Sequence, residues 1–212
     1  MVENIHWLGH DAFRVEGEKR LYFDPYNLKK GLPSADIIFI THEHFDHCSP
    51  RDVERVAGPD TVIVTNAASA QKLRGNVQVV APGDSLTVQG ISVEVVPAYN
   101  INKFRSPGVP FHPKEAGHLG FIVTVGGQRL YHAGDTDFIP EMKSLQVDVA
   151  LLPVSGIYVM TAEEAIEAAK ALRPQVAIPM HYGAGVAGTI RDAERFRDGL
   201  KGIVEVVILK QE

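Results

Sequence analysis

The segment from His42 to His47 concentrates three histidines and an aspartate directly after the apolar stretch Ile37-Ile38-Phe39-Ile40. An uninterrupted apolar run of this length is typical of a β-strand that is covered on both faces. His42 and His44 are two residues apart, so in extended backbone both side chains point to one side. Neutral imidazoles and carboxylates bind Zn²⁺, Mn²⁺ or Fe²⁺ at neutral pH, and burying so many of them without a partner is costly. The segment therefore predicts a metal site, with room for two ions, at the end of a buried strand.

The rest of the chain predicts a single layered α/β domain over residues 1–212. Strands are expected at 4–8, 12–15, 20–23, 36–41, 61–65, 77–80, 85–88, 91–96, 119–125, 128–133, 148–152, 176–179 and 203–209. Helices are expected at 50–56, 67–73, 161–172 and 189–200. The third of these begins with a capping box, in which Thr161 and Glu164 can satisfy each other's backbone N–H groups. Residues 97–117 contain four prolines and little periodicity, and long irregular loops in compact domains are usually functional.

Composition excludes several classes of protein. The formal charge of −5 disfavours a nucleic-acid binder, which usually carries a basic face. A lone cysteine, Cys48, allows no internal disulfide and points to a reducing cytoplasm. The N-terminus lacks a signal-peptide pattern, and no apolar run approaches the roughly 20 residues of a membrane span. We therefore expect a cytoplasmic protein that acts without a membrane.

The pattern His42-x-His44-x-Asp46-His47 resembles the signature of the metallo-β-lactamase superfamily, whose fold is a four-layer αββα sandwich with a dinuclear site at the sheet edge. Two later motifs extend the resemblance. Tyr131-His132-Ala133-Gly134-Asp135-Thr136 looks like the strand end that carries a metal-bridging aspartate, and Ile178-Pro179-Met180-His181-Tyr182-Gly183 looks like the last ligand motif. Asp24 resembles an aspartate that supports the ligands from behind. The resemblance covers nearly the whole chain and is closest to poorly characterised metal-dependent hydrolases near the ascorbate 6-phosphate lactonase branch.

The chain departs from the superfamily pattern at the third ligand of the first metal. Many relatives carry a histidine where this sequence has Tyr99-Asn100, and the candidates here are His112 and His118. We favour His112, because it lies in the proline-constrained loop and is free to turn inward, whereas the pleat of the following strand fixes the direction of His118. The sequence leaves His10 open between a pocket residue and a polar side chain in a turn.

The resemblance implies hydrolysis by a metal-bound hydroxide, with Asp46 and Asp135 as the catalytic carboxylates. Asp135 would bridge the two metals. The implied ligands of the first metal are His42, His44 and His112, and those of the second are Asp46, His47 and His181. Two divalent ions are expected, Zn²⁺ or Mn²⁺ first and Fe²⁺ or Co²⁺ as alternatives, because a His/Asp donor set accepts all four. The lactonase-like resemblance favours Mn²⁺.

Three other functions compete with hydrolysis. Di-iron oxidoreductases share the scaffold, but such relatives carry a glutamate where this chain has His44. A nuclease would need a basic groove, and a non-catalytic metal-binding protein would hold metal without turnover. The expected partner is a small anionic molecule such as a lactone or phosphodiester, with Lys103, Arg105 and Lys114 available to meet its charge. A homo-oligomer is compatible with the sequence.

Overall fold

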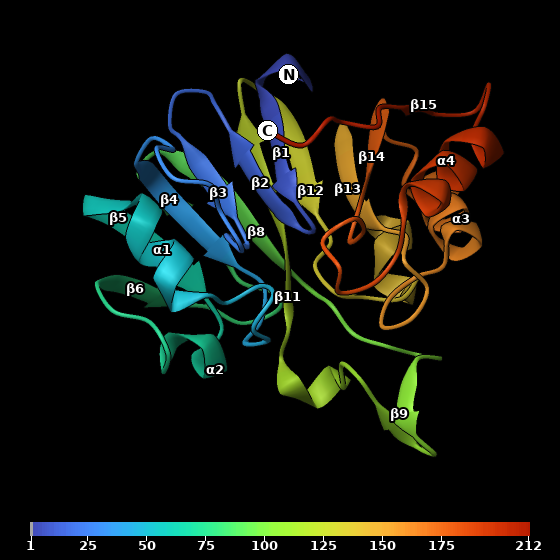
Figure 1. Cartoon of the computed structure of the whole chain (residues 1–212), viewed down its shortest axis with the longest axis horizontal. Helices are drawn as coiled ribbons and strands as arrows, with labels where there is room; N and C mark the ends of the chain where they lie inside the picture. Colours follow the sequence, from blue (N-terminus) through green and yellow to red (C-terminus); the bar gives the residue numbers. More distant parts are fainter. Residues whose placement is uncertain (1) are drawn as a thin grey trace.

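Two mixed β-sheets pack face to face and carry helices on their outer sides in the computed structural model, which describes residues 2–212 (Figure 1). The first sheet has the order β1-β2-β3-β4-β5-β6. Its strands are β1 (Ile5–Gly9), β2 (Ala12–Val15), β3 (Leu21–Phe23), β4 (Ala35–Ile40), β5 (Ala57–Thr65) and β6 (Asn76–Val79). The second sheet has the order β15-β14-β13-β12-β11-β8-β7. Its strands are β7 (Ser85–Val88), β8 (Ile91–Pro97), β11 (Leu119–Val125), β12 (Gln128–His132), β13 (Val149–Pro153), β14 (Val176–Met180) and β15 (Glu205–Val206).

The helices complete the four layers that the sequence predicted. Helices α1 (Pro50–Val56) and α2 (Ala67–Ala70) lie on one side of the paired sheets, and α3 (Ala162–Leu172) and α4 (Ile190–Gly199) lie on the other (Figure 1). Short 3₁₀ turns occur at η1 (Val2–Asn4), η2 (Lys114–Ala116) and η3 (Pro140–Ser144). The capping box of Thr161 and Glu164 is present at the start of α3. Within residues 2–212, no helix combines the length and apolarity that crossing a membrane requires.

The burial of residues 37–40 explains why this part of β4 is apolar throughout. Ile37 and Phe39 are buried in the large core that includes residues of both sheets, whereas Ile38 and Ile40 are buried in a second cluster with Val53 of α1 and its neighbours. Because successive side chains of a strand point to opposite faces, a strand covered on both faces must be apolar throughout. The expected doubly covered strand is therefore confirmed.

Parallel pairing brings distant segments to one edge. Strands β3, β4, β5 and β6 are mutually parallel along the first sheet, as are β12, β13, β14 and β15 along the second. The loops that leave β4, β12 and β14 carry the three motifs singled out in the sequence. Carboxyl ends of parallel strands share an edge, so this topology gathers the motifs.

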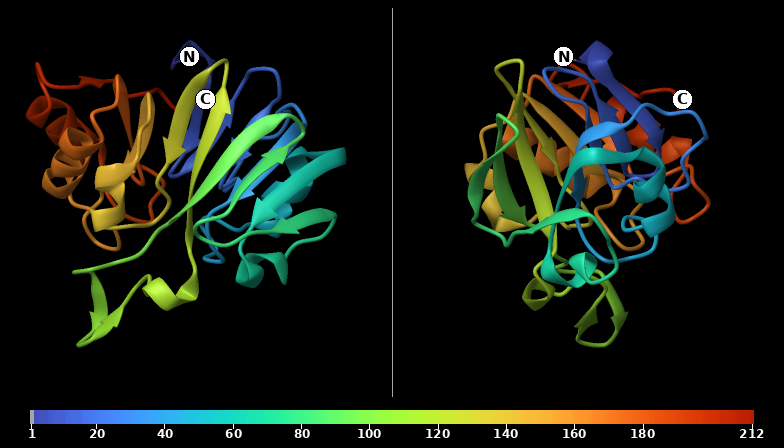
Figure 2. Two further views of the ribbon diagram at one scale, coloured as in Figure 1. Left: turned by 180° about the vertical axis from the view of Figure 1, so that it is seen from behind. Right: turned by 90° about the vertical axis from the view of Figure 1, so that its left-hand side faces the viewer.

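Two expected elements differ from the structure. Residues 97–117 are not wholly irregular, because they contain the small hairpin β9 (Phe104–Ser106) and β10 (Val109–Pro110), which projects from the sheets (Figures 1 and 2). Lys103 and Phe111 close this hairpin through a backbone hydrogen bond that local periodicity does not reveal. The strand expected at 203–209 is reduced to β15, after which Gln211 forms an isolated bridge with Trp7 of β1.

Candidate metal centre

Strained backbone marks the segments that carry the candidate ligands. Three non-glycine residues near them have positive φ: His10 (53°), Asp24 (40°) and His181 (61°). Such conformations cost of order 1–3 kcal/mol each and persist where surrounding contacts enforce them, which is common at functional sites. Gly134, just before Asp135, also has a positive φ of 64°, and a Cβ there would lie 2.6 Å from the carbonyl oxygen of Leu119. Only glycine allows the loop after β12 to approach β11 this closely.

The structure gathers candidate ligands into three groups, in each of which one ligand atom per residue lies within 4.8 Å of the others; two of the groups share His47 and His181. All members are buried. The first group is His42, His112 and His118; the second is His10, Asp46, His47 and His181; the third is Asp11, His47, Asp135 and His181.

The first metal position is defined by donor atoms around His42. Nδ1 of His44 lies 3.0 Å from Nε2 of His42, and Nε2 of His112 lies 3.2 Å from Oδ2 of Asp135. Nε2 of His42 is 3.9 Å from the same Asp135 oxygen. Two nitrogens that share a tetrahedral zinc ion, each about 2.1 Å from it, would stand about 3.4 Å apart. These separations fit atoms that bind one cation.

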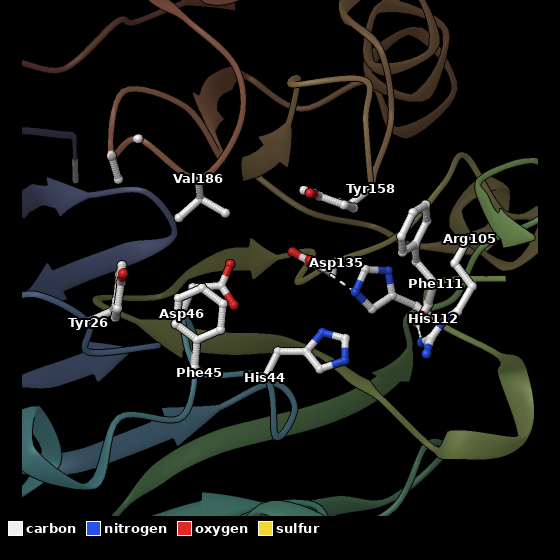
Figure 3. Close-up of a pocket in the computed structure, with 12 residues that line it drawn as sticks. Tyr26, His44, Phe45, Asp46, Arg105, Phe111, His112, Asp135, Tyr158 and Val186 are labelled. Carbon is white, nitrogen blue, oxygen red and sulfur yellow. Dashed lines mark hydrogen bonds and ion pairs between the residues drawn. The ribbon is translucent and has the colours of Figure 1, made fainter.

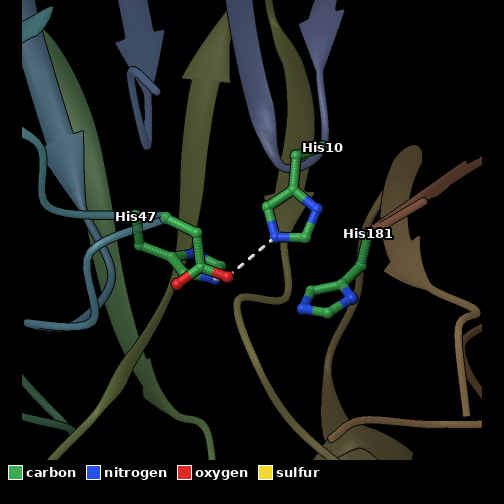
Figure 4. A group of neighbouring side chains, drawn as sticks. His10, His47 and His181 are labelled. Atoms are coloured by element: carbon green, nitrogen blue, oxygen red, sulfur yellow. Dashed lines mark hydrogen bonds and ion pairs between the residues drawn. The ribbon is translucent and has the colours of Figure 1, made fainter. Parts of the chain in front are cut away.

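The second metal position lies on the other side of Asp135. Nε2 of His47 is 3.3 Å from Oδ1 of Asp135, and Nε2 of His181 is 3.3 Å from Oδ2. Oδ2 of Asp46 is 3.8 Å from Nε2 of His47 and 3.1 Å from Nε2 of His10. The imidazoles of His10, His47 and His181 come from three separate loops (Figure 4). Oδ2 of Asp135 thus faces donor atoms of both positions.

The second nitrogen of most candidate histidines is held by a polar partner. Nδ1 of His47 lies 2.8 Å from Oδ2 of Asp24, and Nδ1 of His181 lies 2.8 Å from Oγ of Ser155. Nδ1 of His42 lies 3.0 Å from Oγ1 of Thr41. Partners of this kind fix the tautomer and direction of metal-binding imidazoles. Asp24 also accepts hydrogen bonds from the backbone N–H and hydroxyl of Thr41, so it supports the site from behind, as the sequence suggested.

The two loop histidines differ in this support. His112 is buried and its Nδ1 lies 3.0 Å from Oδ1 of Asn100, which also accepts the backbone N–H of His112 at 2.8 Å. Both ring nitrogens of His118 lack a hydrogen-bond partner among the described residues. Nε2 of His118 instead lies 3.3 Å from Oε2 of Glu43.

The unpartnered atoms test whether a cation fits. Nε2 of His47, Nε2 of His181 and Oδ1 of Asp135 are buried and form no hydrogen bond to any described residue. Buried polar atoms are almost always paired, because an unpaired one costs about 1–3 kcal/mol. Lone pairs of imidazole and carboxylate that converge without donors match what a divalent cation requires. The second position therefore fits a divalent cation, and the separations of the donor atoms around His42 fit another.

Charges divide the site into two halves. Burial, and then the proximity of His112, lowers the pKa of His44 to about 4, and burial also lowers the pKa of His42. Burial lowers the pKa of His181 too, but Asp135 and Asp11 outweigh it and raise that pKa to about 9; Asp135 likewise raises the pKa of His47. Burial thus favours the neutral form of His42 and His44, whereas the neighbouring carboxylates favour protonation of His47 and His181, so metal binding at the second position competes with protons.

A cavity of about 660 Å³ opens beside the centre (Figure 3). Asp46, Asp135, His44 and His112 form part of its wall. The remainder is mainly apolar or aromatic: Tyr26, Phe45, Phe111, Tyr158, Ala184, Gly185 and Val186, with Arg105 as the one basic side chain besides the histidines. Figure 3 shows Arg105 beside Phe111 and His112, away from Tyr26 and Phe45. Ligand pockets of enzymes are usually of this size and mixed character.

A model of the β-lactamase superfamily domain matches residues 4–181. The chain belongs to this superfamily. A UPF0173 metal-dependent hydrolase from Archaeoglobus fulgidus is similar to this β-lactamase superfamily protein, with 34% identity over 231 residues that cover 97% of this chain and 95% of the relative. A crystal structure of a Parabacteroides distasonis protein superposes with a TM-score of 0.86 at 35% identity, covering 98% of this chain and 93% of that one. Igni18, a metallo hydrolase from Ignicoccus hospitalis, superposes with a TM-score of 0.77 at 25% identity, covering 97% and 94%.

The fold brings all seven ligands that the sequence predicted to one place. Their role as ligands stays a prediction. Six of them are members of the three groups, although the groups also include His10, Asp11 and His118; the six are His42, Asp46, His47, His112, Asp135 and His181. The seventh, His44, is outside these groups, although its Nδ1 lies 3.0 Å from Nε2 of His42. The narrower resemblance to the ascorbate 6-phosphate lactonase branch also stays a prediction.

Sequence reasoning missed Asp11 altogether and left His10 open. Both lie in the turn between β1 and β2, and both are completely buried beside the second metal position. No local pattern marked Asp11, because an acidic residue in a short turn between two strands is usually exposed.

Proposed function

We propose that this protein is a hydrolase that acts with two divalent cations on a small anionic substrate that carries an apolar group. The first cation would be held by His42, His44, His112 and Asp135, and the second by Asp46, His47, Asp135 and His181. One observation carries the proposal: the donor atoms of these side chains face one another across 3.0–3.9 Å. His112 is preferred to His118 because its second nitrogen is held by Asn100.

The cations, when bound, lower the pKa of a water molecule toward neutrality and polarise the substrate. The protein's own residues then fix the reacting groups. Burial lowers the pKa of His10 to about 4, despite the hydrogen bond to Asp46, so at neutral pH its ring is uncharged. Its Nε2 donates to Oδ2 of Asp46 and fixes that carboxylate at the cavity wall. Asp46 is thereby placed to orient the attacking water.

Three lysine or arginine side chains lie in the segment 97–117, and within residues 2–212 only one of them is free to bind an anionic substrate. Lys103 is paired with Asp137 and Glu164, and Lys114 is paired with Glu141. Among the described residues, Arg105 forms no ion pair and donates only to the carbonyl oxygen of Phe111. A guanidinium at a pocket wall can bind a carboxylate or phosphate bidentately. Arg105 is therefore the proposed anion-binding residue.

The apolar wall supports a substrate with an aromatic or aliphatic body. Tyr26, Phe45 and Val186 line the cavity near Asp46, whereas Tyr158 packs against Phe111 on the side where Arg105 lies (Figure 3). A lactone or phosphodiester with a hydrophobic group at one end and an anionic group at the other would satisfy both regions. Burial of aromatic side chains against such a body contributes binding energy, and the charge fixes its orientation.

The proposal is tested by elemental analysis of protein purified without added metal, followed by turnover assays on lactones, thioesters and phosphodiesters. We expect two divalent ions per chain and turnover on at least one class. Asp135→Ala should lose at least about a hundredfold in kcat/KM and Asp198→Ala, an exposed control, should not change. Two bound metals without turnover on any class would favour a non-catalytic metal-binding protein. A folded, metal-loaded Asp135→Ala protein with unchanged turnover would refute the assignment.

Arg105→Ala tests the substrate class separately. With an anionic substrate, KM should rise about tenfold while kcat stays within a factor of two, because one charge-assisted contact contributes of order 1.5–3 kcal/mol to binding before solvent screening. Lys114→Ala is the matched control, since its charge is already paired with Glu141. Equal effects of the two substitutions would remove Arg105 from the binding site.

A further inference from the structure

We propose that Asp11 is an additional carboxylate ligand of the second metal position and that it adapts this position to Mn²⁺ or Fe²⁺ rather than Zn²⁺. The inference rests on the two-metal centre of the proposed function. It concerns a residue that lies outside the ligand signature His42-x-His44-x-Asp46-His47 and the two later motifs.

The turn between β1 and β2 places Asp11 beside the second metal position. His10 adopts a φ of 53°, and the carbonyl oxygen of Asp11 accepts a hydrogen bond from Nε2 of His132 at 2.9 Å. These constraints leave Asp11 with no solvent-exposed surface. Oδ2 of Asp11 lies 3.6 Å from Nε2 of His47, and Asp11 shares a group within 4.8 Å with His47, Asp135 and His181. The carboxylate therefore lies among the donor atoms of the second position.

Neither oxygen of Asp11 has a hydrogen-bond donor within residues 2–212. Other buried aspartates of the fold are well supplied: Asp24 accepts from Thr41 and His47, and Asp52 accepts from two backbone N–H groups. A fully buried carboxylate without a donor is strongly unfavourable unless a positive charge compensates it. Three of the atoms that face Asp11 also lack a hydrogen-bond partner among the described residues: Nε2 of His47, Nε2 of His181 and Oδ1 of Asp135. One shared cation would satisfy these three atoms and the Asp11 carboxylate together.

Adding Asp11 makes the two positions chemically different. The first position has three imidazoles and the shared Asp135, four donors that suit tetrahedral zinc. The second combines the imidazoles of His47 and His181 with the carboxylates of Asp11 and Asp135 in one group, and Asp46 lies in the neighbouring group that shares both histidines. Carboxylate oxygens are harder donors than imidazole nitrogens, so this carboxylate-rich position suits Mn²⁺ better than the first position does. The three carboxylates also offset three of the four positive charges that two divalent ions bring into a buried site.

The experiment compares Asp11→Asn with the whole wild-type protein, each stripped of metal by chelation. Manganese binding is followed by the loss of the free Mn²⁺ signal in electron paramagnetic resonance, and zinc binding by a chromophoric chelator in competition. We expect Asp11→Asn to bind the second Mn²⁺ at least about tenfold more weakly, since loss of even an outer partner of a metal ligand costs 10–100-fold. Zinc affinity at the first position should stay unchanged. Asp52→Asn is the control for loss of a buried carboxylate remote from the centre.

Thermal unfolding distinguishes a ligand from a structural residue. Asp11 accepts no hydrogen bond within residues 2–212, so replacing its carboxyl group should cost the metal-free fold little. Metal-free Asp11→Asn should therefore melt near the wild-type temperature, whereas its manganese-loaded form should melt lower than the manganese-loaded wild type. Asp11→Ser repeats the test with a smaller side chain. Unchanged second-site affinity in both variants overturns the inference, as does a lower melting temperature in the metal-free form alone. A wild-type protein that binds no second metal would overturn the proposed function instead, and two-metal wild type without turnover would overturn hydrolysis while leaving Asp11 as a ligand.

Discussion

Asn100 holds His112 in place, and replacing it with leucine should weaken the first metal position. Oδ1 of Asn100 accepts from the backbone N–H and from Nδ1 of His112, and Nδ2 donates to the carbonyl oxygen of Tyr158 at 2.9 Å. In Asn100→Leu, the backbone N–H of His112, its Nδ1 and the carbonyl oxygen of Tyr158 each lose this hydrogen-bond partner. At about 1 kcal/mol for each group, the lower end of the cost of an unpaired buried polar group, the fold should lose about 3 kcal/mol.

The loss of metal affinity is a separate quantity. Removing the partner of a metal-binding imidazole costs 10–100-fold in affinity, which corresponds to about 1.4–2.7 kcal/mol. Competition with a zinc chelator at 25 °C measures this affinity on protein that is still folded, and urea unfolding of the metal-free form measures the stability. We expect both quantities to fall in Asn100→Leu.

Asn100→Asp provides the rescue. An aspartate keeps the acceptor for His112 but loses the donor to Tyr158, and it places a second carboxylate near Oδ1 of Asp137, which is 3.3 Å from Nδ2 in the native protein. This variant should retain metal affinity while losing stability. Wild-type zinc affinity in Asn100→Leu would refute the reasoning, because His112 would then not depend on Asn100 or would not bind the metal.

Three further predictions concern other residues. His112→Ala should lose the first metal by elemental analysis whereas His118→Ala should keep both, because only His112 has a partner on its second nitrogen; equal loss from both would contradict this. Burial raises the pKa of Glu164, but hydrogen bonds from Lys103 and the backbone of Thr161 outweigh burial and hold that pKa below its usual value. The ionised carboxylate therefore stabilises the fold above pH ~4.3, and this stabilisation is lost as the pH falls. Glu164→Gln should therefore lower the melting temperature at pH 7, and the difference should shrink near pH 3; a constant difference would argue against an electrostatic role. Burial raises the pKa of Cys48 to about 11, so iodoacetamide at pH 8 should label it slowly in the native protein and rapidly in urea, and equal rates would show that the thiol is accessible.

Much of the fold could be predicted because local patterns carried it. The uninterrupted apolar run at 37–40 of β4 and the capping box of α3 are properties of a few neighbouring residues, and both are confirmed. The segment 97–117 was harder, because Pro107-Gly108 is a turn signal but the strands on either side of it are too short to show an alternating pattern, and Lys103 and Phe111 close the hairpin. The C-terminal segment also depends on distant contacts, which replace most of the strand expected there with an isolated bridge to Trp7.

The sequence by itself determined that His42, His44, Asp46 and His47 lie together, because the spacing of side chains along one short segment after a strand is fixed by the backbone. The resemblance added Asp135 and His181 to that cluster. Only the tertiary structure decided which loop histidine has an orienting partner and which of the three basic side chains forms no ion pair among the described residues. It also decided that Asp11 is buried among the ligands. Each of these depends on atoms from segments far apart in the chain, such as Nδ1 of His112 and Oδ1 of Asn100, or Lys103 and Glu164. Direction, pairing and burial of a side chain are set by such neighbours, and those neighbours meet only when the sheets pack.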